Sequence, residues 1–290
     1  MPVPLVENAP AKVNLTLRVL RRRDDGYHEL ESLVAFADFG DRLSFSRGGD
    51  LKLTVRGRSA AQAGEGEDNL VLKAAHALAK RRPATILGAF RLDKKLPVAA
   101  GLGGGSADAG AALRLIAQAN GLPGDDPNLY AAARATGADV PVCLDPRPRI
   151  MRGIGEMLSA PLALPKLPAL LVNPGVALPT KAVFAEWTPT GEHGTAADLD
   201  AIAKLSSRDQ VLQFLGTQSN DLEPPAVAVQ PVIAGVLAAL RELAGCRLAR
   251  MSGSGATCFA LFAAAAAARE AANIMSGKFP LWWVKATTLN

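Results

Sequence analysis

Aromatic residues and cysteines are both scarce in this chain of 290 residues. Phe, Trp and Tyr together make up 5% of it, and only three cysteines are present: Cys143, Cys246 and Cys258. They lie far apart, form no Cys-x-x-Cys motif and have no His neighbours, which argues against a zinc site. Widely spaced cysteines in odd number are typical of reduced, partly buried thiols, and we therefore expect a cytoplasmic protein.

Long apolar runs and a strong excess of one charge are also missing. The longest apolar run, residues 256–268, is too short to span a bilayer, and no apolar signal segment opens the sequence, so we expect no membrane association. The net charge of +5 and the pI near 9.3 mildly favour anionic ligands. The basic runs at residues 21–23 and 80–82 have no interleaved aromatic residues, and we expect no nucleic-acid partner.

The remaining composition is that of a globular protein, with 49% hydrophobic and 20% charged residues. A chain of this length suits one large domain or two ordinary ones. Prolines recur and charge falls over residues 146–168, and we place a domain boundary there, between a first domain of residues 1–155 and a second of residues 156–290. Strands and helices on both sides of the boundary predict an α/β (α+β) fold.

In the first half, apolar and polar residues alternate over residues 12–19, which predicts a half-buried strand whose polar face carries Lys12 and Asn14 side by side. Further strands are predicted at residues 30–39, 42–46, 51–55 and 89–95, with turns at Gly40-Asp41 and Gly48-Gly49. Helices are predicted over residues 69–82 and from Asp126-Pro127 to Gly137.

In the second half, strands are predicted at residues 169–173, 246–251, 257–262 and 281–287. Helices are predicted at residues 180–187, 231–244 and, in an Ala-rich segment, up to residue 276. A loop through His193-Gly194 and small helices over residues 199–215 lie between them.

The stretch of residues 96–120 predicts a glycine-rich loop that runs directly into a helix. Gly101 and Gly103 to Gly105 lack a Cβ, so the backbone can turn tightly and present its N–H groups to a ligand. Ser106 suits the N-cap and Asp108 the first turn, while Asn120-Gly121 is a stop signal. Such a helix start binds anions, above all phosphate, although a merely flexible loop is the alternative. No Lys follows the last Gly, which excludes a Walker A loop, and Ser106 replaces the third Gly of a Rossmann fingerprint.

Two further segments carry polar residues at turns. Asp139 lies in Gly137-Ala138-Asp139-Val140-Pro141, which the proline pushes toward extended geometry. Asp139 either stabilises a turn or helix cap, or its carboxylate acts as a general base. The turn Ser252-Gly253-Ser254-Gly255 either binds a phosphate through its amides or simply joins two strands.

Residues 9–14, 96–106, 137–141 and 252–256 together resemble, in order and spacing, the GHMP kinase superfamily. Residues 25–28, 69–71, 174–175, 179–180 and 220–223 also look like one member of it, a kinase that acts on an alcohol linked to cytidine diphosphate. The resemblance covers nearly the whole chain. It implies an N-terminal α/β domain with a left-handed crossover, a ferredoxin-like C-terminal domain, and an active site in the cleft between them.

The resemblance also assigns roles. Asp139 is the base that takes the proton of the acceptor hydroxyl, and Lys12 is an electrostatic group beside it. ATP is bound by Asn69, Lys94, Pro97, Ala99, Ala100, Gly101, Leu102, Gly103, Gly104, Gly105 and Ser106. The cytidine diphosphate-linked substrate is bound by Asn14, Tyr27, His28, Asp139, Thr180, Phe184, Gly253 and Ser254. Tyr27 stacks on the cytosine, His28 hydrogen-bonds its edge and Phe184 closes the other side.

Mg²⁺ is implied as a cofactor, held mainly by phosphates and water with no protein ligand, and the protein is expected to be a monomer or a weak homodimer. Each assigned role has a structural alternative: a solvated lysine for Lys12 or Lys94, a surface turn for Tyr27-His28, core packing for Phe184 and a helix cap for Thr180. Asp108 departs from the family pattern and adds an unfavourable charge near a triphosphate unless it points away.

Two other functions stay open. One is a GHMP kinase for another small alcohol, of the mevalonate or homoserine type. The other is a catalytically silent nucleotide-binding protein on the same fold.

Overall fold

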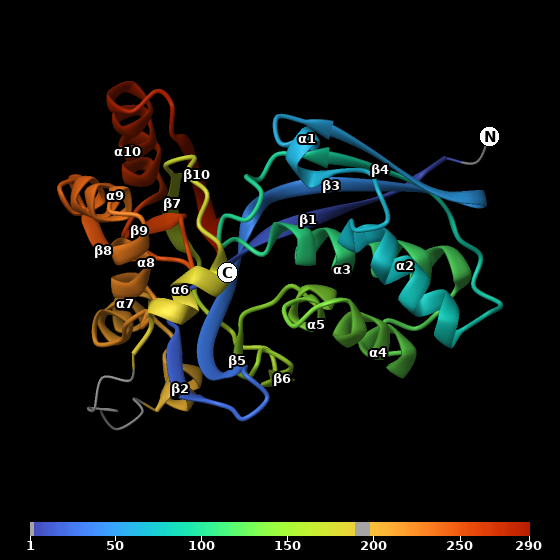
Figure 1. The fold of residues 1–290 in the computed structure, drawn as a ribbon. Helices are drawn as coiled ribbons and strands as arrows, with labels where there is room; N and C mark the ends of the chain where they lie inside the picture. Colours follow the sequence, from blue (N-terminus) through green and yellow to red (C-terminus); the bar gives the residue numbers. More distant parts are fainter. Residues whose placement is uncertain (1–2, 189–197) are drawn as a thin grey trace. The chain divides into compact units, whose positions relative to one another are not determined.

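The computed structural model describes residues 3–188 and 198–290, which form two compact units (Figure 1). The first unit comprises the residues up to Lys12 together with Gly40–Val98 and Gly103–Pro146. The second comprises Val13–Phe39, Ala99–Leu102 and Arg147–Asn290. The long strands β1 (Leu5–Asn14) and β3 (His28–Gly57) therefore contribute residues to both units. The loop predicted through His193-Gly194 lies outside the described residues.

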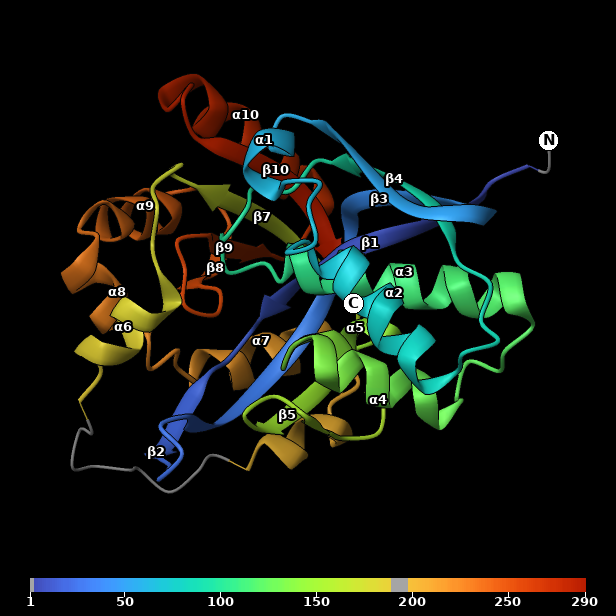
Figure 2. The same cartoon turned by 45° about the vertical axis from the view of Figure 1, so that its right-hand side comes forward.

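The first unit packs helices against strands β1, β3 and β4 (Gly88–Lys94). Its helices are α1 (Ala60–Ala63), α2 (Leu70–Arg81), α3 (Gly104–Asn120), α4 (Pro127–Thr136) and α5 (Val140–Leu144). Figures 1 and 2 both show α2, α3 and α4 on the same side of these strands. The apolar stripe of α2 is buried, as its spacing predicts, because burial of apolar area drives the packing.

Strand β3 reverses direction beside β4. Residues 42–47 pair with residues 93–88 in falling order, and residues 52–57 pair with residues 89–94 in rising order. Gly48 and Gly49 lie at the reversal with φ angles of 93° and 74°, which glycine adopts without strain. The turn predicted there is thus present. The turn predicted at Gly40-Asp41 is wrong, because Gly40 lies so close to the backbone of Ala9 that no side chain would fit and the strand runs on.

The second unit is built on an antiparallel sheet in the order β6-β5-β3-β10-β7-β9-β8, with β2 also paired to β3. Its other strands are β2 (Arg18–Arg22), β5 (Arg149–Gly153), β6 (Met157–Leu158), β7 (Leu167–Asn173), β8 (Cys246–Met251), β9 (Cys258–Phe262) and β10 (Trp283–Leu289). Its helices are α6 (Thr180–Glu186), η1 (Leu199–Lys204), α7 (Arg208–Gly216), α8 (Glu223–Val229), α9 (Val232–Arg241) and α10 (Ala265–Lys278).

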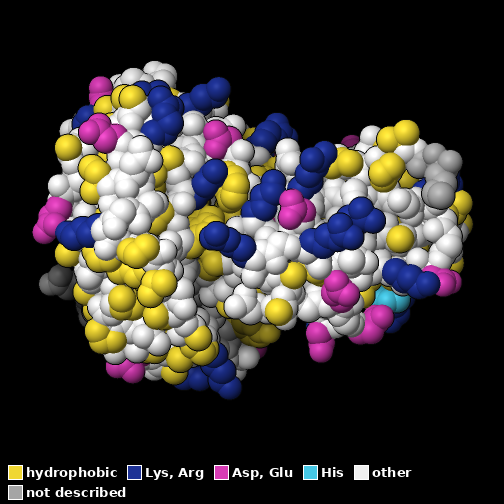
Figure 3. Space-filling view, turned by 90° about the horizontal axis from the view of Figure 1, so that it is seen from above, with side chains coloured by type: hydrophobic (Ala, Val, Ile, Leu, Met, Phe, Trp, Pro, Cys, Tyr) yellow, Lys and Arg dark blue, Asp and Glu magenta, His cyan; other side chains and the backbone are white. Residues whose placement is uncertain are grey.

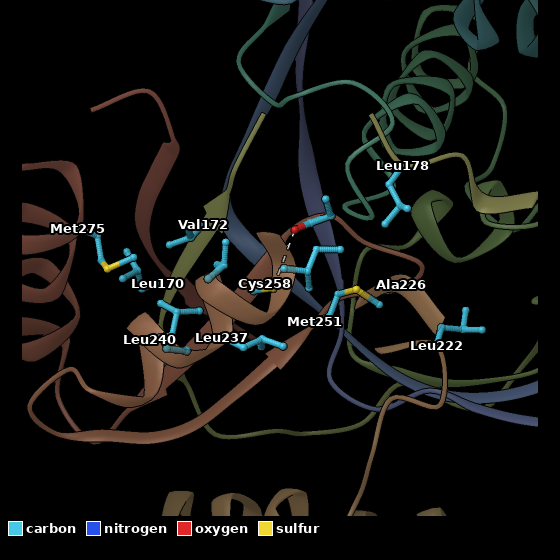
Figure 4. Close-up of a cluster of buried hydrophobic side chains, with 14 of the residues drawn as sticks. Leu170, Val172, Leu178, Leu222, Ala226, Leu237, Leu240, Met251, Cys258 and Met275 are labelled. Carbon is cyan, nitrogen blue, oxygen red and sulfur yellow. Dashed lines mark hydrogen bonds between the residues drawn. The ribbon is translucent and has the colours of Figure 1, made fainter. Parts of the chain in front are cut away.

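The core of the second unit lies between this sheet and its helices. Figure 4 shows Leu170 and Val172 of β7 gathered with Leu237 of α9 and Met275 of α10. Cys258 is buried in the same cluster, and burial raises the pKa of its thiol. Cys143 is also buried and Cys246 is half-buried, and all three are free cysteines, which confirms the sequence prediction.

Charged residues are spread over the surface. Figure 3 shows Lys and Arg side chains interspersed with Asp and Glu side chains on the visible face. Among the described residues, no helix combines the length and the apolar character that crossing a bilayer requires.

Three local predictions need correction. The strand predicted at residues 12–19 ends at Asn14 and resumes at Arg18, and its polar face is buried: Lys12, Asn14 and Thr16 are 3%, 4% and 0% exposed. Ser106 is not the N-cap of α3, since the helix begins at Gly104 after Gly103 in the left-handed conformation. The segment around Asp139 is not extended, because Pro141 lies in the first turn of α5, where its missing N–H is not needed.

Helices α1, α5 and α8 and strands β5 and β6 were not predicted.

Candidate active site

The glycine-rich loop leads from β4 into α3 and leaves the first amides of the helix without intrahelical acceptors. The earliest helical bond runs from the Ala107 N–H to the Gly103 carbonyl, at 2.8 Å. The amides of Gly104, Gly105 and Ser106 precede it, and no side chain caps them. Gly103 has a φ of 60°, which orients this helix start at little conformational cost. The arrangement suits a phosphate group.

An ion pair lies beside this helix start within the first unit. Lys12 Nζ is 2.8 Å from Asp139 Oδ2, and the two side chains are 4% and 39% exposed. A Cβ added to Gly103 would lie 3.1 Å from Lys12 Cε, so the lysine stem runs against the glycine that precedes α3. Lys12 is therefore not a solvated strand lysine. Asp139 stands at the N-cap position of α5 but makes no capping hydrogen bond, which leaves its carboxylate available for chemistry.

Lys94 is buried as well, and two carboxylates bind its ammonium. Its Nζ lies 2.6 Å from Asp41 Oδ2 and 2.6 Å from Asp108 Oδ2. Burial alone would lower the pKa of Lys94, but the charges of Asp108 and Asp41 outweigh it and raise that pKa. Burial raises the pKa of Asp108 to about 7. Asp108, which departs from the family pattern, is thus paired with Lys94 inside the protein. Asp41 was not among the predicted site residues, since its partners are more than fifty positions away in the sequence.

In the second unit, the turn of residues 252–255 supports residues 99–102 of the glycine-rich loop. The Thr257 N–H donates to the Ala100 carbonyl (3.1 Å), and Ser252 Oγ donates to the Gly101 carbonyl (2.9 Å). A side chain on Gly101 would collide with the backbone of Ser252, so the contact requires glycine. The turn therefore does more than join β8 to β9. Ser252 is not among the predicted site residues of this turn, since its partners Gly101 and Asn14 are more than a hundred positions away in the sequence.

Asn14 is attached to the same turn. Its backbone N–H donates to Ser252 Oγ (3.1 Å), and its side-chain Nδ2 donates to Ser32 Oγ (2.7 Å). A Cβ on Gly253 would lie 3.2 Å from Asn14 Oδ1, and Gly253 itself has a φ of 58°. Asn14, Gly101 and Gly253 are thus brought together in the second unit, as Lys12, Asp139 and Gly103 are in the first.

Aromatic side chains gather in another part of the second unit. The rings of His28 and Phe184 are stacked with centroids 4.7 Å apart, and Trp187 meets His28 edge-on at 5.5 Å. Tyr27 is 60% exposed, and Thr180 Oγ1 lies 2.8 Å from Ser254 Oγ. Burial, assisted by Arg22, lowers the pKa of His28, which favours the neutral ring. Trp187 was not predicted, although its place three residues after Phe184 on a helical pattern was a usable signal.

Asn69 has a clear structural role. Its side-chain oxygen accepts from the Val71 N–H and caps α2, while its Nδ2 donates to the carbonyls of Ala63 and Gly64. The helix predicted from residue 69 is confirmed with Asn69 as its cap. Thr180 is the first residue of α6, and Phe184 is half-buried against the core of the second unit.

Comparison with known proteins decides the family. Residues 69–145 match the family described as GHMP kinases N terminal domain, and residues 195–281 match GHMP kinases C terminal. A protein of Methylobacterium radiotolerans named 4-diphosphocytidyl-2-C-methyl-D-erythritol kinase is 57% identical over 98% of this chain and 99% of its own. The chain belongs to the GHMP kinase family. This confirms the predicted resemblance and the prediction of an ATP-dependent small-molecule kinase.

Solved structures agree with this fold. A crystal structure of 4-(cytidine 5'-diphospho)-2C-methyl-D-erythritol kinase is 34% identical, covers 99% of each chain and superposes with a TM-score of 0.79. Homoserine kinase from Cytophaga hutchinsonii covers 100% of this chain and 96% of its own with a TM-score of 0.74. Its identity is only 20%, so it supports the shared mixed α/β fold and not a shared substrate.

Proposed function

We propose that this GHMP kinase transfers the terminal phosphate of ATP to the 2-hydroxyl of 4-diphosphocytidyl-2-C-methyl-D-erythritol. The products are the 2-phosphate and ADP, and the reaction belongs to the methylerythritol phosphate route to isoprenoid precursors. The observation that carries the proposal is the 57% identity, over nearly the full chain, to a kinase of that name. The Lys12–Asp139 pair beside the start of α3 supports it, since a silent nucleotide-binding protein needs neither residue.

In the proposed mechanism, the N-terminus of α3 and the loop of residues 96–106 hold the phosphates of ATP. The Asp139 carboxylate takes the proton of the acceptor hydroxyl as the new O–P bond forms. The Lys12 ammonium, 2.8 Å from Asp139, stabilises the negative charge that develops on the acceptor oxygen and the phosphoryl group. Asn69 and Lys94, with Pro97 and residues 99–106, complete the proposed ATP site.

The cytidine end of the substrate is proposed to bind at the aromatic residues of the second unit. Tyr27 is exposed and its ring offers a stacking face, while neutral His28 offers both a donor and an acceptor to the edge of cytosine. Stacking alone has no base preference, so the hydrogen bonds of His28 select the base. Phe184 backs the His28 ring, and Asn14, Thr180, Gly253 and Ser254 are proposed to bind the remainder of the substrate.

Mg²⁺ neutralises phosphate charge in reactions of this kind. Among the described residues there is no group of three or more acidic, His or Cys side chains that could hold a metal ion, so we propose that phosphates and water bind most of it. We also propose two domains, residues 1–155 with a left-handed crossover and residues 156–290 with a ferredoxin-like fold, with the active site in the cleft between them. The protein is further proposed to be a monomer or a weak homodimer and to be cytoplasmic.

The decisive experiment measures ADP release with a panel of alcohols. The panel contains 4-diphosphocytidyl-2-C-methyl-D-erythritol, the same compound with uracil in place of cytosine, mevalonate and homoserine. The cytidine compound should give the highest kcat/KM, and the uracil compound a much lower one. Faster turnover of mevalonate or homoserine would establish the alternative GHMP kinase function instead.

The base site is tested by Tyr27→Ala, with Tyr27→Phe as the matched control that keeps the ring. Stacking on a base contributes ~1–3 kcal/mol, so Tyr27→Ala should raise the KM for the cytidine substrate roughly five- to 150-fold. The KM for ATP should stay unchanged. Equal changes in both KM values would refute the assignment of Tyr27 to the cytosine.

A further inference from the structure

Asp41, Lys94 and Asp108 form a buried charge triad in the first unit. Of the three residues, only Lys94 has a role in the proposed function, as part of the ATP site. Their side chains are 0%, 3% and 3% exposed. A Cβ added to Gly104 would lie 3.2 Å from Lys94 Nζ, so the ammonium lies directly against the first residue of α3. Lys94 therefore contacts the part of the chain whose amides are proposed to hold phosphate.

Asp41 attaches the beginning of the glycine-rich loop to this ammonium. Its Oδ2 accepts from Lys94 Nζ, and its Oδ1 accepts from the backbone N–H groups of Lys95 (2.6 Å) and Leu96 (2.8 Å). These three hydrogen bonds join Asp41 to the end of β4 and to the first residues of the loop. Asp41 thus fixes where the loop leaves the strand.

Asp108 attaches the other end of the loop. It lies four residues after Gly104, about one helical turn into α3, and its Oδ2 accepts from Lys94 Nζ at 2.6 Å. The triad therefore connects β3, the end of β4 and α3 through one ammonium, on both sides of the loop. A backbone that must present its amides to phosphates needs such fixed attachment points.

The charges of the triad are unbalanced when both acids are ionised, since one ammonium faces two carboxylates. Asp108 Oδ1 is buried without a hydrogen-bond partner among the described residues, so only Oδ2 of this carboxylate is hydrogen-bonded there, to Lys94. The buried residues that α2 and α4 contribute are apolar, and the nearby Cys143 thiol of α5 stays neutral because burial raises its pKa to about 12. The other charged groups near α3 form pairs of their own: Lys12 on β1 with Asp139, and Arg114 of α3 with Glu7.

We propose that Asp41 and Asp108 are positioning residues that act through Lys94: they set the glycine-rich loop and the first turn of α3 for the nucleotide phosphates, and ionisation of Asp108 weakens phosphate binding there. This rests on the proposed function, because it requires ATP at this loop. Lys94 acts on ATP through the backbone that it positions. A proton on Asp108 makes the triad neutral, and a nearby triphosphate favours that state because like charges repel.

The first test substitutes Asp41→Asn and Lys94→Met and measures kcat and the KM for ATP. Asn at position 41 would turn an N–H₂ group toward either the ammonium or the loop amides, all of which are donors. We expect the KM for ATP to rise roughly tenfold or more in both variants, because small displacements of positioning groups have effects of this size. Asp126→Asn is the control, since it removes an ion pair of the same unit with Arg82, far along the chain from the loop. It should lower the Tm and leave the KM for ATP unchanged.

The second test uses Asp108→Asn, which keeps the shape and removes the charge, and follows the KM for ATP from pH 6 to pH 8.5. The ratio of the wild-type KM to the variant KM should rise with pH, because only the wild type gains a buried negative charge; the ionisation of ATP itself affects both proteins equally. A constant ratio, or wild-type KM values in Asp41→Asn and Lys94→Met, would refute the triad proposal. A wild-type protein that turns over no cytidine-linked alcohol would instead refute the proposed function, and direct binding of an ATP analogue would still test the triad.

Discussion

Two buried lysines of the first unit are paired with carboxylates in opposite ways. Lys12 meets Asp139, whose side chain is 39% exposed, whereas Lys94 meets two carboxylates that are at most 3% exposed. Each lysine lies against one glycine at the start of α3, Lys12 against Gly103 and Lys94 against Gly104. In the proposed function, the open pair acts on the substrate hydroxyl, and in the proposal above the sealed triad holds the backbone of the loop in place. The exposure of the acidic partner, and not the lysine itself, separates chemistry from positioning.

The largest expected effect is on the open pair. Asp139→Asn should lower kcat by a factor of about 10²–10⁴, the usual contribution of a general base, because the amide cannot accept the proton of the acceptor hydroxyl. The KM for ATP should stay close to the wild-type value, whereas the Tm should fall, because the buried ammonium of Lys12 loses its countercharge. Initial-rate kinetics and thermal unfolding measure both.

The open pair and the sealed triad can be compared directly by making the same isosteric substitution, Asp to Asn, in each of them. Asp41→Asn should act on the KM for ATP, and Asp139→Asn on kcat. If Asp139→Asn kept its kcat, the open pair would have no role as a base, and the contrast between the two lysines would lose its chemical meaning.

The two glycines give the next largest effect. Gly103→Ala places a side chain on a residue with a φ of 60°, which costs about 1–2 kcal/mol, so the Tm should fall. Gly104→Ala is a favourable change for helix α3 in itself, but its Cβ would lie 3.2 Å from an ammonium that two carboxylates hold in place.

Both glycine variants should raise the KM for ATP, by roughly three- to tenfold, since displaced amides bind phosphate less well. Only Gly103→Ala should also lower the Tm. A Gly104→Ala protein with the wild-type KM would show that Lys94 yields easily and that the sealed triad does not control the loop.

The sequence predicted those helices whose first and last residues are typical helix caps. The start of α2 near Asn69, the start of α4 at Asp126-Pro127 and the end of α3 at Gly121 are as predicted, because the capping partner lies within a few residues. The glycine-rich loop before a helix was likewise visible, and the family resemblance gave the candidate residues that the structure brings together in each unit.

The rest depended on partners distant in sequence. The alternation at residues 12–19 predicted an exposed polar face, but Lys12 is buried because Asp139, 127 positions later, provides its countercharge. Ser106 is a good cap by composition, yet Gly103 opens the helix because only a left-handed residue turns the loop into it. The sequence predicts Asp41 only as a turn residue, since nothing near it in the sequence indicates that it accepts from Lys94 and two loop amides.

The last and smallest expected effect is on the pH dependence of the Tm, which distinguishes the buried carboxyl of Asp108 from an exposed one. Burial raises the pKa of Asp108 from 3.8 to about 7 on folding, so the native state binds this proton more tightly than the unfolded state does. The corresponding stability is fully present below pH 4 and is lost as the pH rises to about 7. Asp108→Asn carries no such proton, so its Tm relative to the wild type should rise from pH 4 to pH 8 in thermal melts.

Asp126→Asn is a control of opposite sign for this measurement. Hydrogen bonds from Asn128, with the charge of Arg82, lower the pKa of Asp126, so its stabilisation is present above its unfolded pKa near 4 and disappears as the pH falls below it. The Tm deficit of Asp126→Asn should therefore shrink on acidification, whereas Asp108→Asn should lose its advantage there. If the Tm difference of Asp108→Asn did not change with pH, the carboxyl of Asp108 would ionise in the folded protein as readily as one in solvent; if it changed in the same direction as that of Asp126→Asn, the carboxyl would ionise more readily. Either result would show that the triad is not sealed.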